Sequence, residues 1–297
     1  ISRVAVWKQI KKIQALGYTV ESKQKEGYKL TKNSDLLLPW EIVSGLETKV
    51  LGQQAYYFDS VDSTQSQAMK MVSESKKEGT IIIAEKQTGG RGRSGRKWVS
   101  PKGGIWFSII LHPKFDISNT TLFPIASSLA LSIAIQKTCK ISTELKWPND
   151  LTIKGKKLAG MLIDASLESN KIENLVLGVG INFNVNVKEI EKELKKTPNF
   201  YGVSSLNDQK NKTSQIELIQ SFLLELEKVY EELNKNQIKK IITEWTKRSS
   251  TIGKQVEMNT LNGKISGKAI KIDEDGGLII KDKEKTNKIF AGDIVHL

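Results

Sequence analysis

The apolar positions of this chain repeat with two different periods. Four apolar residues near its start recur at helical spacing: Val6, Ile10, Ile13 and Leu16. With Ser2 as N-cap and Gly17 just beyond the last turn, this pattern predicts an amphipathic helix over residues 2–16. Two short segments rich in β-branched and aromatic residues then flank a polar turn at 22–27. They predict a β-hairpin directly after the helix.

The rest of the chain alternates between strand and helix patterns. Segments that are apolar and short enough for strands are 56–58, 80–85, 104–111, 158–167 and 174–183, and we expect the last two to share one sheet. We expect a brief helix over 39–47 with Pro39 at its first position, and a helix over 65–75 after the N-cap signal of 62–65. The apolar, small-residue-rich segment 121–139 predicts a buried helix, and the amphipathic pattern of 214–248 predicts two more. From Gly253 onward, turn signals at 262–263 and 275–277 separate short β segments. This region predicts a small barrel of about five strands.

Length and composition limit the class of protein. The chain has 297 residues, of which 38% are hydrophobic and 27% charged, and this suits about two globular domains or one large domain with appendages. No apolar stretch approaches the roughly 18 residues of a membrane span and no signal peptide is visible, so we expect no membrane partner. The single cysteine, Cys139, excludes an internal disulfide framework. It fits a reducing cytoplasm, where we expect the protein to reside.

Charged and titratable residues narrow the chemistry further. The chain has two histidines, which excludes Ser-His-Asp triads and His-rich metal sites, and we predict no set of metal ligands. The net charge is +13, and basic residues concentrate in two segments. Residues 1–33 hold eight Lys or Arg against two Glu, and residues 86–104 hold six Lys or Arg and no acid. Two basic patches indicate polyanionic or acidic partners at two separate places.

The second basic segment contains a loop with an unusual composition. Residues 89–98 combine four glycines, four Lys or Arg and Trp98, between two predicted core strands. Glycine lets the backbone approach a ligand closely and point several N–H groups at it. Arginines add forked donors that suit carboxylate and phosphate oxygens. We therefore expect this loop to wrap an anion, with a flexible basic loop as the alternative.

This loop carries a family resemblance. The string Gly-Arg-Gly-Arg-x-Gly-Arg-x-Trp over 90–98, preceded by Ala84-Glu85-Lys86-Gln87, resembles the biotin- and adenylate-binding loop of biotin protein ligases. Four other segments are similar to motifs of that family and follow its order: Asp62-Ser63-Thr64-Gln65, Lys146-Trp147-Pro148-Asn149-Asp150, Gly155-Lys156-Lys157-Leu158-Ala159-Gly160 and Gly178-Val179-Gly180-Ile181-Asn182. The resemblance extends from residue 1 to the C-terminus.

The resemblance implies an α+β fold in three domains. These are a partial winged helix-turn-helix DNA-binding module over 1–33, a class II synthetase-like catalytic domain with a mixed sheet over 40–249, and an SH3-like β-barrel over 250–297. It implies an enzyme that makes biotinyl-5'-AMP from biotin and ATP with Mg²⁺. The biotin then passes to a lysine of the biotin carboxyl carrier domain of acetyl-CoA carboxylase or a related carboxylase. A homodimer carrying biotinyl-AMP would act as a biotin-responsive repressor on operator DNA.

The resemblance also assigns roles to residues. Residues implied in biotin binding are Ser63, Thr64, Gln65, Gln87, Arg91, Gly92, Arg93 and Lys157. Residues implied in binding ATP or the adenylate are Arg91, Arg93, Arg96, Trp98, Lys146, Asn149 and Asn182. Residues implied in catalysis are Lys157, Arg91, Arg93 and Asp150, the last as general base, although a structural turn explains Asp150 equally well. Gln65 stands where the family usually has Asn, and residues 200–206 occupy the place of a loop that covers the adenine.

The first helix resembles the DNA-reading helix of the bifunctional ligase/repressors. Residues implied in DNA binding are Ser2, Arg3, Lys8, Lys11 and Lys12. A helix-turn-helix needs a preceding helix that crosses the DNA backbone, and this chain starts without one. We therefore expect operator binding only from a complete module and weak, salt-sensitive binding from the chain as given.

Two other functions compete with the ligase. One is a biotin-sensing repressor without ligase activity, which biotin-dependent exchange of pyrophosphate into ATP would distinguish from an enzyme. The other is a lipoate- or octanoyl-transferring enzyme on a related scaffold. The second is disfavoured because the Arg-rich loop and the stretch 146–150 stand where biotin ligases have them.

Overall fold

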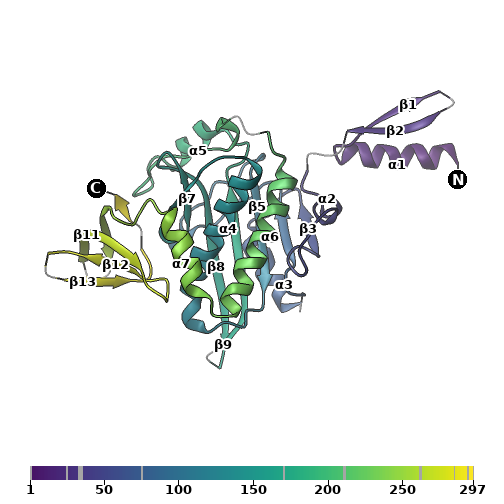
Figure 1. The fold of residues 1–297 in the computed structure, drawn as a ribbon. Helices are drawn as coiled ribbons and strands as arrows, with labels where there is room; N and C mark the ends of the chain where they lie inside the picture. The colour runs from purple at the N-terminus through teal and green to yellow at the C-terminus, as the bar shows by residue number, and fades with distance from the viewer. Residues whose placement is uncertain are drawn as a thin grey trace.

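The chain forms three successive parts in a computed structural model (Figure 1). The structure describes residues 2–24, 26–32, 36–74, 76–169, 171–209, 212–260, 263–283, 285–292 and 294–296. A helix and hairpin lie at one side of a central α+β unit, and a small sheet lies at the other side. Two expected positions, the helix end at Ser75 and the turn residue Asn262, lie outside the described residues. No described helix is long and apolar enough to cross a membrane.

The first part contains α1 (Arg3–Ala15), β1 (Thr19–Lys23) and β2 (Gly27–Lys32), which confirms the expected helix and hairpin. Ser2 caps α1, because its hydroxyl accepts a hydrogen bond from the Ala5 N–H. None of the described residues of α1 is buried, and the Trp7 side chain is exposed. The apolar face of this helix is therefore open to solvent in the structure.

The central part is built on a seven-stranded mixed sheet with the order β3-β4-β5-β9-β8-β7-β6. Its strands are β3 (Ala55–Phe58), β4 (Ile81–Ala84), β5 (Ile105–Leu111), β6 (Glu144–Lys146), β7 (Asp150–Ile153), β8 (Lys156–Glu168) and β9 (Lys171–Ile181). Its helices are α2 (Pro39–Val43), α3 (Thr64–Ser73), α4 (Phe123–Thr138), α5 (Val187–Leu194), α6 (Gln215–Asn234) and α7 (Ile238–Lys247). β3 and β4 pair in parallel and the other neighbours are antiparallel. Strands β8 and β9 share this sheet, as expected.

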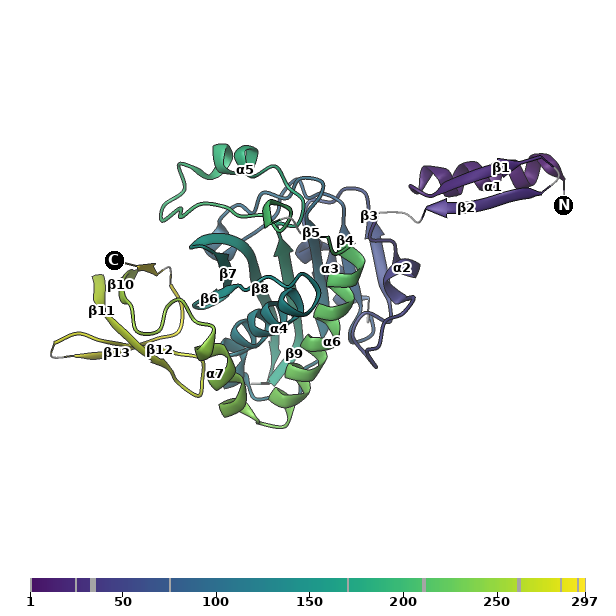
Figure 2. The same ribbon diagram turned by 45° about the horizontal axis from the view of Figure 1, so that its top comes forward.

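Both faces of the sheet are covered, and alternation along each strand divides its side chains between them. On one face, α4 and α6 form the main core, where Phe107 of β5 meets Phe222 of α6 with ring centres 5.8 Å apart. On the other face, Ile110 of β5 packs with Ala68 of α3. Figures 1 and 2 show α4 and α6 on the near side of the sheet and α3 behind it. The alternation places Ser108 on the α3 side.

The last part is a five-stranded antiparallel sheet with the order β13-β12-β11-β10-β14. Its strands are β10 (Gln255–Thr260), β11 (Gly263–Ile272), β12 (Leu278–Lys281), β13 (Thr286–Ile289) and β14 (Val295–His296). One boundary expectation is wrong: the helix predicted over 39–47 ends at Val43, because Ser44 takes an extended backbone with φ −66° and ψ 110°. The remaining expected helices and strands are present with ends shifted by a few residues.

Candidate active site

A cavity opens on the α3 side of the central sheet. It is lined by residues from the start of α3, from β5, β8 and β9, from the loop 91–99, from the turn 146–150 and from the segment 190–203. Gly292 and Ile294 of the last part also line it. Six described lining residues are Lys or Arg and Asp150 is the one acid among them, so the cavity favours anionic ligands.

Hydroxyl and amide groups form one wall of the cavity. The Thr64 N–H and hydroxyl both donate to Gln87 Oε1, at 2.7 and 3.1 Å. The Ser108 hydroxyl lies 3.0 Å from both Thr64 Oγ1 and Gln65 Oε1, and the Gln65 amide donates to the Val176 carbonyl. Such a wall presents fixed donors and acceptors to a neutral polar ring or amide.

Three residues of this wall, Ser63, Gln65 and Ser108, have features that the sequence motifs do not predict. Ser63 is the N-cap of α3, but its side chain makes no capping hydrogen bond with the first turn of the helix. Gln65 is 97% buried, and a Cβ on Gly178 would lie 2.5 Å from its Oε1. The longer amide therefore fits because position 178 lacks a side chain. Ser108 was not predicted from the sequence, although it is the one polar residue within the apolar run 105–111.

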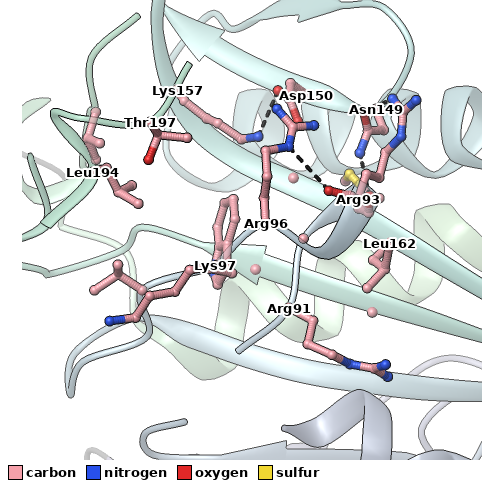
Figure 3. Close-up of a pocket in the computed structure, with 18 of the residues that line it drawn as sticks. Arg91, Arg93, Arg96, Lys97, Asn149, Asp150, Lys157, Leu162, Leu194 and Thr197 are labelled. Atoms are coloured by element: carbon pink, nitrogen blue, oxygen red, sulfur yellow. Dashed lines mark hydrogen bonds and ion pairs between the residues drawn. The ribbon is translucent and has the colours of Figure 1, made fainter. Parts of the chain in front are cut away.

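The Gly/Arg-rich loop folds over the cavity and is held by its own backbone. The Gly92 N–H donates to the Arg96 carbonyl at 2.7 Å, and Arg96 Nε donates to the Arg93 carbonyl at 3.2 Å. Arg93 Nη1 donates to Asn149 Oδ1 at 3.0 Å, which joins the loop to the turn 146–150. Figure 3 shows the Arg93 guanidinium beside Asn149.

Arg91 lies differently from Arg93. Its guanidinium points away from Lys157 and Asp150 (Figure 3) and pairs with Asp164 of β8, with Nη2 and Oδ2 3.2 Å apart. About half of the Arg91 side chain is exposed, so this pair contributes little to stability and can open readily. Arg91 lines the cavity but does not aim its charge at the centre.

Trp98 forms a flat wall next to the basic residues. A Cβ on Gly180 would lie 2.5 Å from its indole ring, so the ring rests on bare backbone of β9. The Trp98 and Trp106 rings meet edge to face with their centres 6.3 Å apart, and Lys157 Nζ lies 5.1 Å from the centre of the Trp98 ring. This surface is suited to stacking with a planar or apolar ligand.

Lys157 is the basic residue most directly aimed at the cavity. Its Nζ lies 2.7 Å from Asp150 Oδ2, and its side chain is 27% exposed, whereas Lys154 and Lys156 are exposed residues. Asp150 Oδ2 also accepts a hydrogen bond of 2.6 Å from the Tyr201 hydroxyl. Lys157 is therefore less exposed to solvent than its two lysine neighbours on the same hairpin.

The proline after Trp147 predicts an exposed turn over 146–150, but this prediction is wrong because two residues of the turn are buried. Trp147 is 2% exposed and Asn149 is 8% exposed. The Trp147 N–H donates to Thr251 Oγ1 and its indole Nε1 donates to the Gly276 carbonyl, both at 3.1 Å. The last part of the chain covers the turn. The local sequence carries no signal of these partners because they lie more than a hundred residues further along the chain.

The remaining predicted residues also lie at the cavity. Asn182 is buried and its amide donates to the Lys157 carbonyl at 3.3 Å. Lys146 Nζ lies over the Tyr201 ring, 3.5 Å from its centre. Burial lowers the pKa of the nearby His296 imidazole, and the positive charges of Lys146 and Lys254 lower it further. Lys97, on the Gly/Arg-rich loop, pairs with Glu193 of α5 across the cavity mouth.

Three segments match known protein families. Residues 57–182 match the Biotin/lipoate A/B protein ligase family, residues 251–297 match the Biotin protein ligase C terminal domain, and residues 1–29 match an HTH domain. The Bacillus subtilis bifunctional ligase/repressor BirA is 36% identical over 99% of this chain and 89% of that protein. The chain belongs to the biotin protein ligase family.

Other biotin protein ligases are also similar to this chain in sequence or in structure. The Mycobacterium tuberculosis biotin--[acetyl-CoA-carboxylase] ligase is 31% identical over 74% of this chain and 80% of that protein. The structure of the Aquifex aeolicus biotin protein ligase in complex with biotin and ATP matches with a TM-score of 0.70 and 29% identity. That match covers 82% of this chain and 99% of the other.

In this member of the biotin protein ligase family, all five sequence motifs contribute residues to one cavity. Every residue expected to bind biotin or the nucleotide lines it, and so does Asp150. The residues expected to bind DNA lie apart from it on α1 (Figure 2). Ser108 joins the lining without having been assigned a role from the sequence, and Tyr201 was expected there only as part of the loop 200–206.

Proposed function

We propose that this chain is an ATP-dependent biotin–protein ligase. The observation that carries the proposal is the cavity itself, which Arg93 and Lys157 line together with a wall of hydroxyls and amides. A carboxylic acid with a polar ring at its other end fits such a site. Forming an acyl-adenylate places growing negative charge on phosphate oxygens, and preorganised cations stabilise that charge.

Biotin would bind with its ureido ring against Ser63, Thr64, Gln65 and Gln87. Its carboxylate would lie near Gly92, Arg93 and Lys157, with Arg91 leaving Asp164 to join them. The hydroxyl and amide wall can both donate to the ureido oxygen and accept from the ureido N–H groups. A lipoyl dithiolane ring offers no N–H or carbonyl group to hydrogen-bond with this wall, which disfavours a lipoate transferase.

ATP would bind toward the other end of the cavity. The residues proposed for this are Arg91, Arg93, Arg96, Trp98, Lys146, Asn149 and Asn182. The α-phosphate would lie between Arg93 and Lys157, within reach of the biotin carboxylate. Mg²⁺ would enter with ATP, because it keeps several waters and takes most of its remaining ligands from the phosphates. Among the described residues, no group of three or more His, Cys, Asp or Glu is placed to hold a metal ion.

The second half-reaction would transfer biotin to a lysine of a biotin carboxyl carrier domain. The lysine nitrogen attacks the carbonyl carbon of biotinyl-AMP, a C–N bond forms, the C–O bond to the phosphate breaks and AMP leaves. The proton lost by the amine would go to Asp150. Asp150 fits this role because it is the one acid among the described lining residues.

The first test is biotin-dependent exchange of labelled pyrophosphate into ATP. We expect purified protein to catalyse this exchange only with biotin and Mg²⁺ present, and lipoate should not replace biotin. Calorimetry should in parallel detect biotin binding. Protein that binds biotin without any exchange would favour a sensor over an enzyme.

We propose further that the domains divide as 1–33, 40–249 and 250–297, with the last an SH3-like barrel. The first would bind operator DNA and give a biotin-responsive repressor, and biotinyl-AMP would favour the homodimer by its own differential affinity. The HTH match and the exposed basic residues of α1 support this second function. Ser2, Arg3, Lys8, Lys11 and Lys12 would contact the DNA.

We expect duplex DNA binding by this chain to weaken steeply between about 50 and 200 mM salt, because phosphate contacts release counterions. The double substitution Lys8→Glu with Lys12→Glu should abolish binding in gel-shift titrations. The same charge change at Lys235 and Lys239, at the far end of the central part, provides the control. Equal loss in both variants would mean that net charge alone, and not α1, holds the DNA.

A further inference from the structure

The two oxygens of the Asp150 carboxylate have unequal surroundings. Oδ2 accepts from the Tyr201 hydroxyl at 2.6 Å and lies 2.7 Å from Lys157 Nζ. Oδ1 is buried and has no hydrogen-bond partner among the described residues. A Cβ on Gly160, which lines the cavity, would lie 3.1 Å from Oδ1. Oδ2 therefore has two partners that orient the carboxylate, whereas Oδ1 is enclosed by the protein.

Tyr201 is itself fixed from two directions. Lys146 Nζ lies 3.5 Å from the centre of its ring, a contact that withdraws electron density and strengthens the hydroxyl as a donor. The backbone after it is paired with β8, because the Lys157 N–H donates to the Gly202 carbonyl at 3.0 Å and the Ser204 N–H donates to the Lys157 carbonyl at 2.8 Å. These contacts hold the phenol beside Lys146 and Asp150.

We propose that Tyr201 is a positioning residue for the transfer of biotin to lysine, acting through Asp150. This inference rests on the proposed ligase function. In the structure, Lys157 and Tyr201 share the anchored oxygen of Asp150. An anionic ligand draws the Lys157 ammonium toward itself, and Tyr201 then remains as the anchor. The carboxylate keeps its orientation, and the place that Lys157 leaves beside Oδ2 becomes available to the incoming amine.

This role separates the two half-reactions. Adenylate formation uses the positive charges of Lys157 and Arg93 and takes no proton to Asp150. In transfer, the lysine nitrogen forms the new C–N bond, AMP leaves with the electrons of the broken C–O bond, and the proton of the amine passes to the Asp150 carboxylate. Loss of the Tyr201 hydroxyl therefore slows transfer and leaves adenylation nearly unchanged.

The test measures both half-reactions of Tyr201→Phe. Transfer is followed in a single turnover from enzyme loaded with biotinyl-AMP, with the carrier domain of a bacterial acetyl-CoA carboxylase as acceptor. We expect transfer to slow roughly tenfold, the effect of one hydrogen bond to a charged group, and pyrophosphate exchange to change less than about twofold. The same substitution at Tyr56, a half-buried residue on β3, provides the control.

A double-mutant cycle distinguishes this role from a structural one. In an Asp150→Ala background, Tyr201→Phe should cause no further loss of transfer, because its partner is gone. Equal slowing of exchange and transfer, or an undiminished effect in that background, would overturn the proposal, as would wild-type transfer in Tyr201→Phe. Wild-type protein without exchange would instead overturn the ligase function, so the two failures are distinguishable.

Discussion

Replacing Lys157 with alanine is expected to slow biotin-dependent pyrophosphate exchange by about a hundredfold. The lysine brings its ammonium into a cavity where Asp150 is the one acid among the described lining residues, and 27% of its side chain is exposed. Losing one preorganised donor to a developing charge typically costs about 3 kcal/mol of transition-state stabilisation, which corresponds to this factor. The measurement is the initial exchange rate at saturating biotin and ATP.

Two neighbours on the same hairpin provide the controls for this variant. Lys154 and Lys156 are exposed, so Lys154→Ala and Lys156→Ala remove the same charge without reaching into the cavity. We expect both to keep exchange within about twofold of wild type, because exposed charges interact weakly through water. Similar rates in all three variants would contradict the role of Lys157.

Replacing Trp147 with alanine is expected to lower the free energy of unfolding by about 4 kcal/mol. The side chain is 2% exposed and joins the main core, and truncating a large buried aromatic typically costs about 3–5 kcal/mol. Its removal also leaves the Gly276 carbonyl without its indole donor. Urea unfolding followed by circular dichroism measures the change.

Trp147→Phe separates packing from hydrogen bonding. The smaller ring keeps most of the buried apolar contact and loses the bond from Nε1 to Gly276, so we expect a loss of about 1–2 kcal/mol. Trp40→Ala, at an exposed aromatic on α2, should change stability by less than about 0.5 kcal/mol. A loss below about 1 kcal/mol in Trp147→Ala would mean that the turn 146–150 is not anchored by the last part of the chain.

Local patterns in the sequence predicted most helices and strands, and the family resemblance predicted most residues that line the cavity. The apolar segments 104–111 and 174–183 predicted β5 and β9, and helical spacing predicted α1 and α6. The glycine and arginine content of 89–98 predicted an anion-binding loop, and the resemblance placed Lys157 and Asn149 with it. These features depend on neighbours along the chain or on motifs with fixed spacing.

Contacts between distant segments account for what the sequence did not predict. Trp147 is buried because Thr251 and Gly276 cover it, and no pattern within 146–150 reports that partner. Arg91 and Arg93 have the same local chemistry, yet one pairs with Asp164 and the other with Asn149 because they leave the loop in different directions. Tyr201 depends in the same way on Asp150, 51 residues earlier in the sequence.

The wide distribution of the lining residues has a consequence for the protein during its synthesis. The cavity takes residues from Ser63 to Ile294, so its wall is incomplete until the strands that follow residue 250 have docked. A chain still emerging from the ribosome folds its earlier segments first and holds only part of this wall. The complete cavity, and the full gain in stability from a ligand that fills it, is therefore reached only after translation of the final strands.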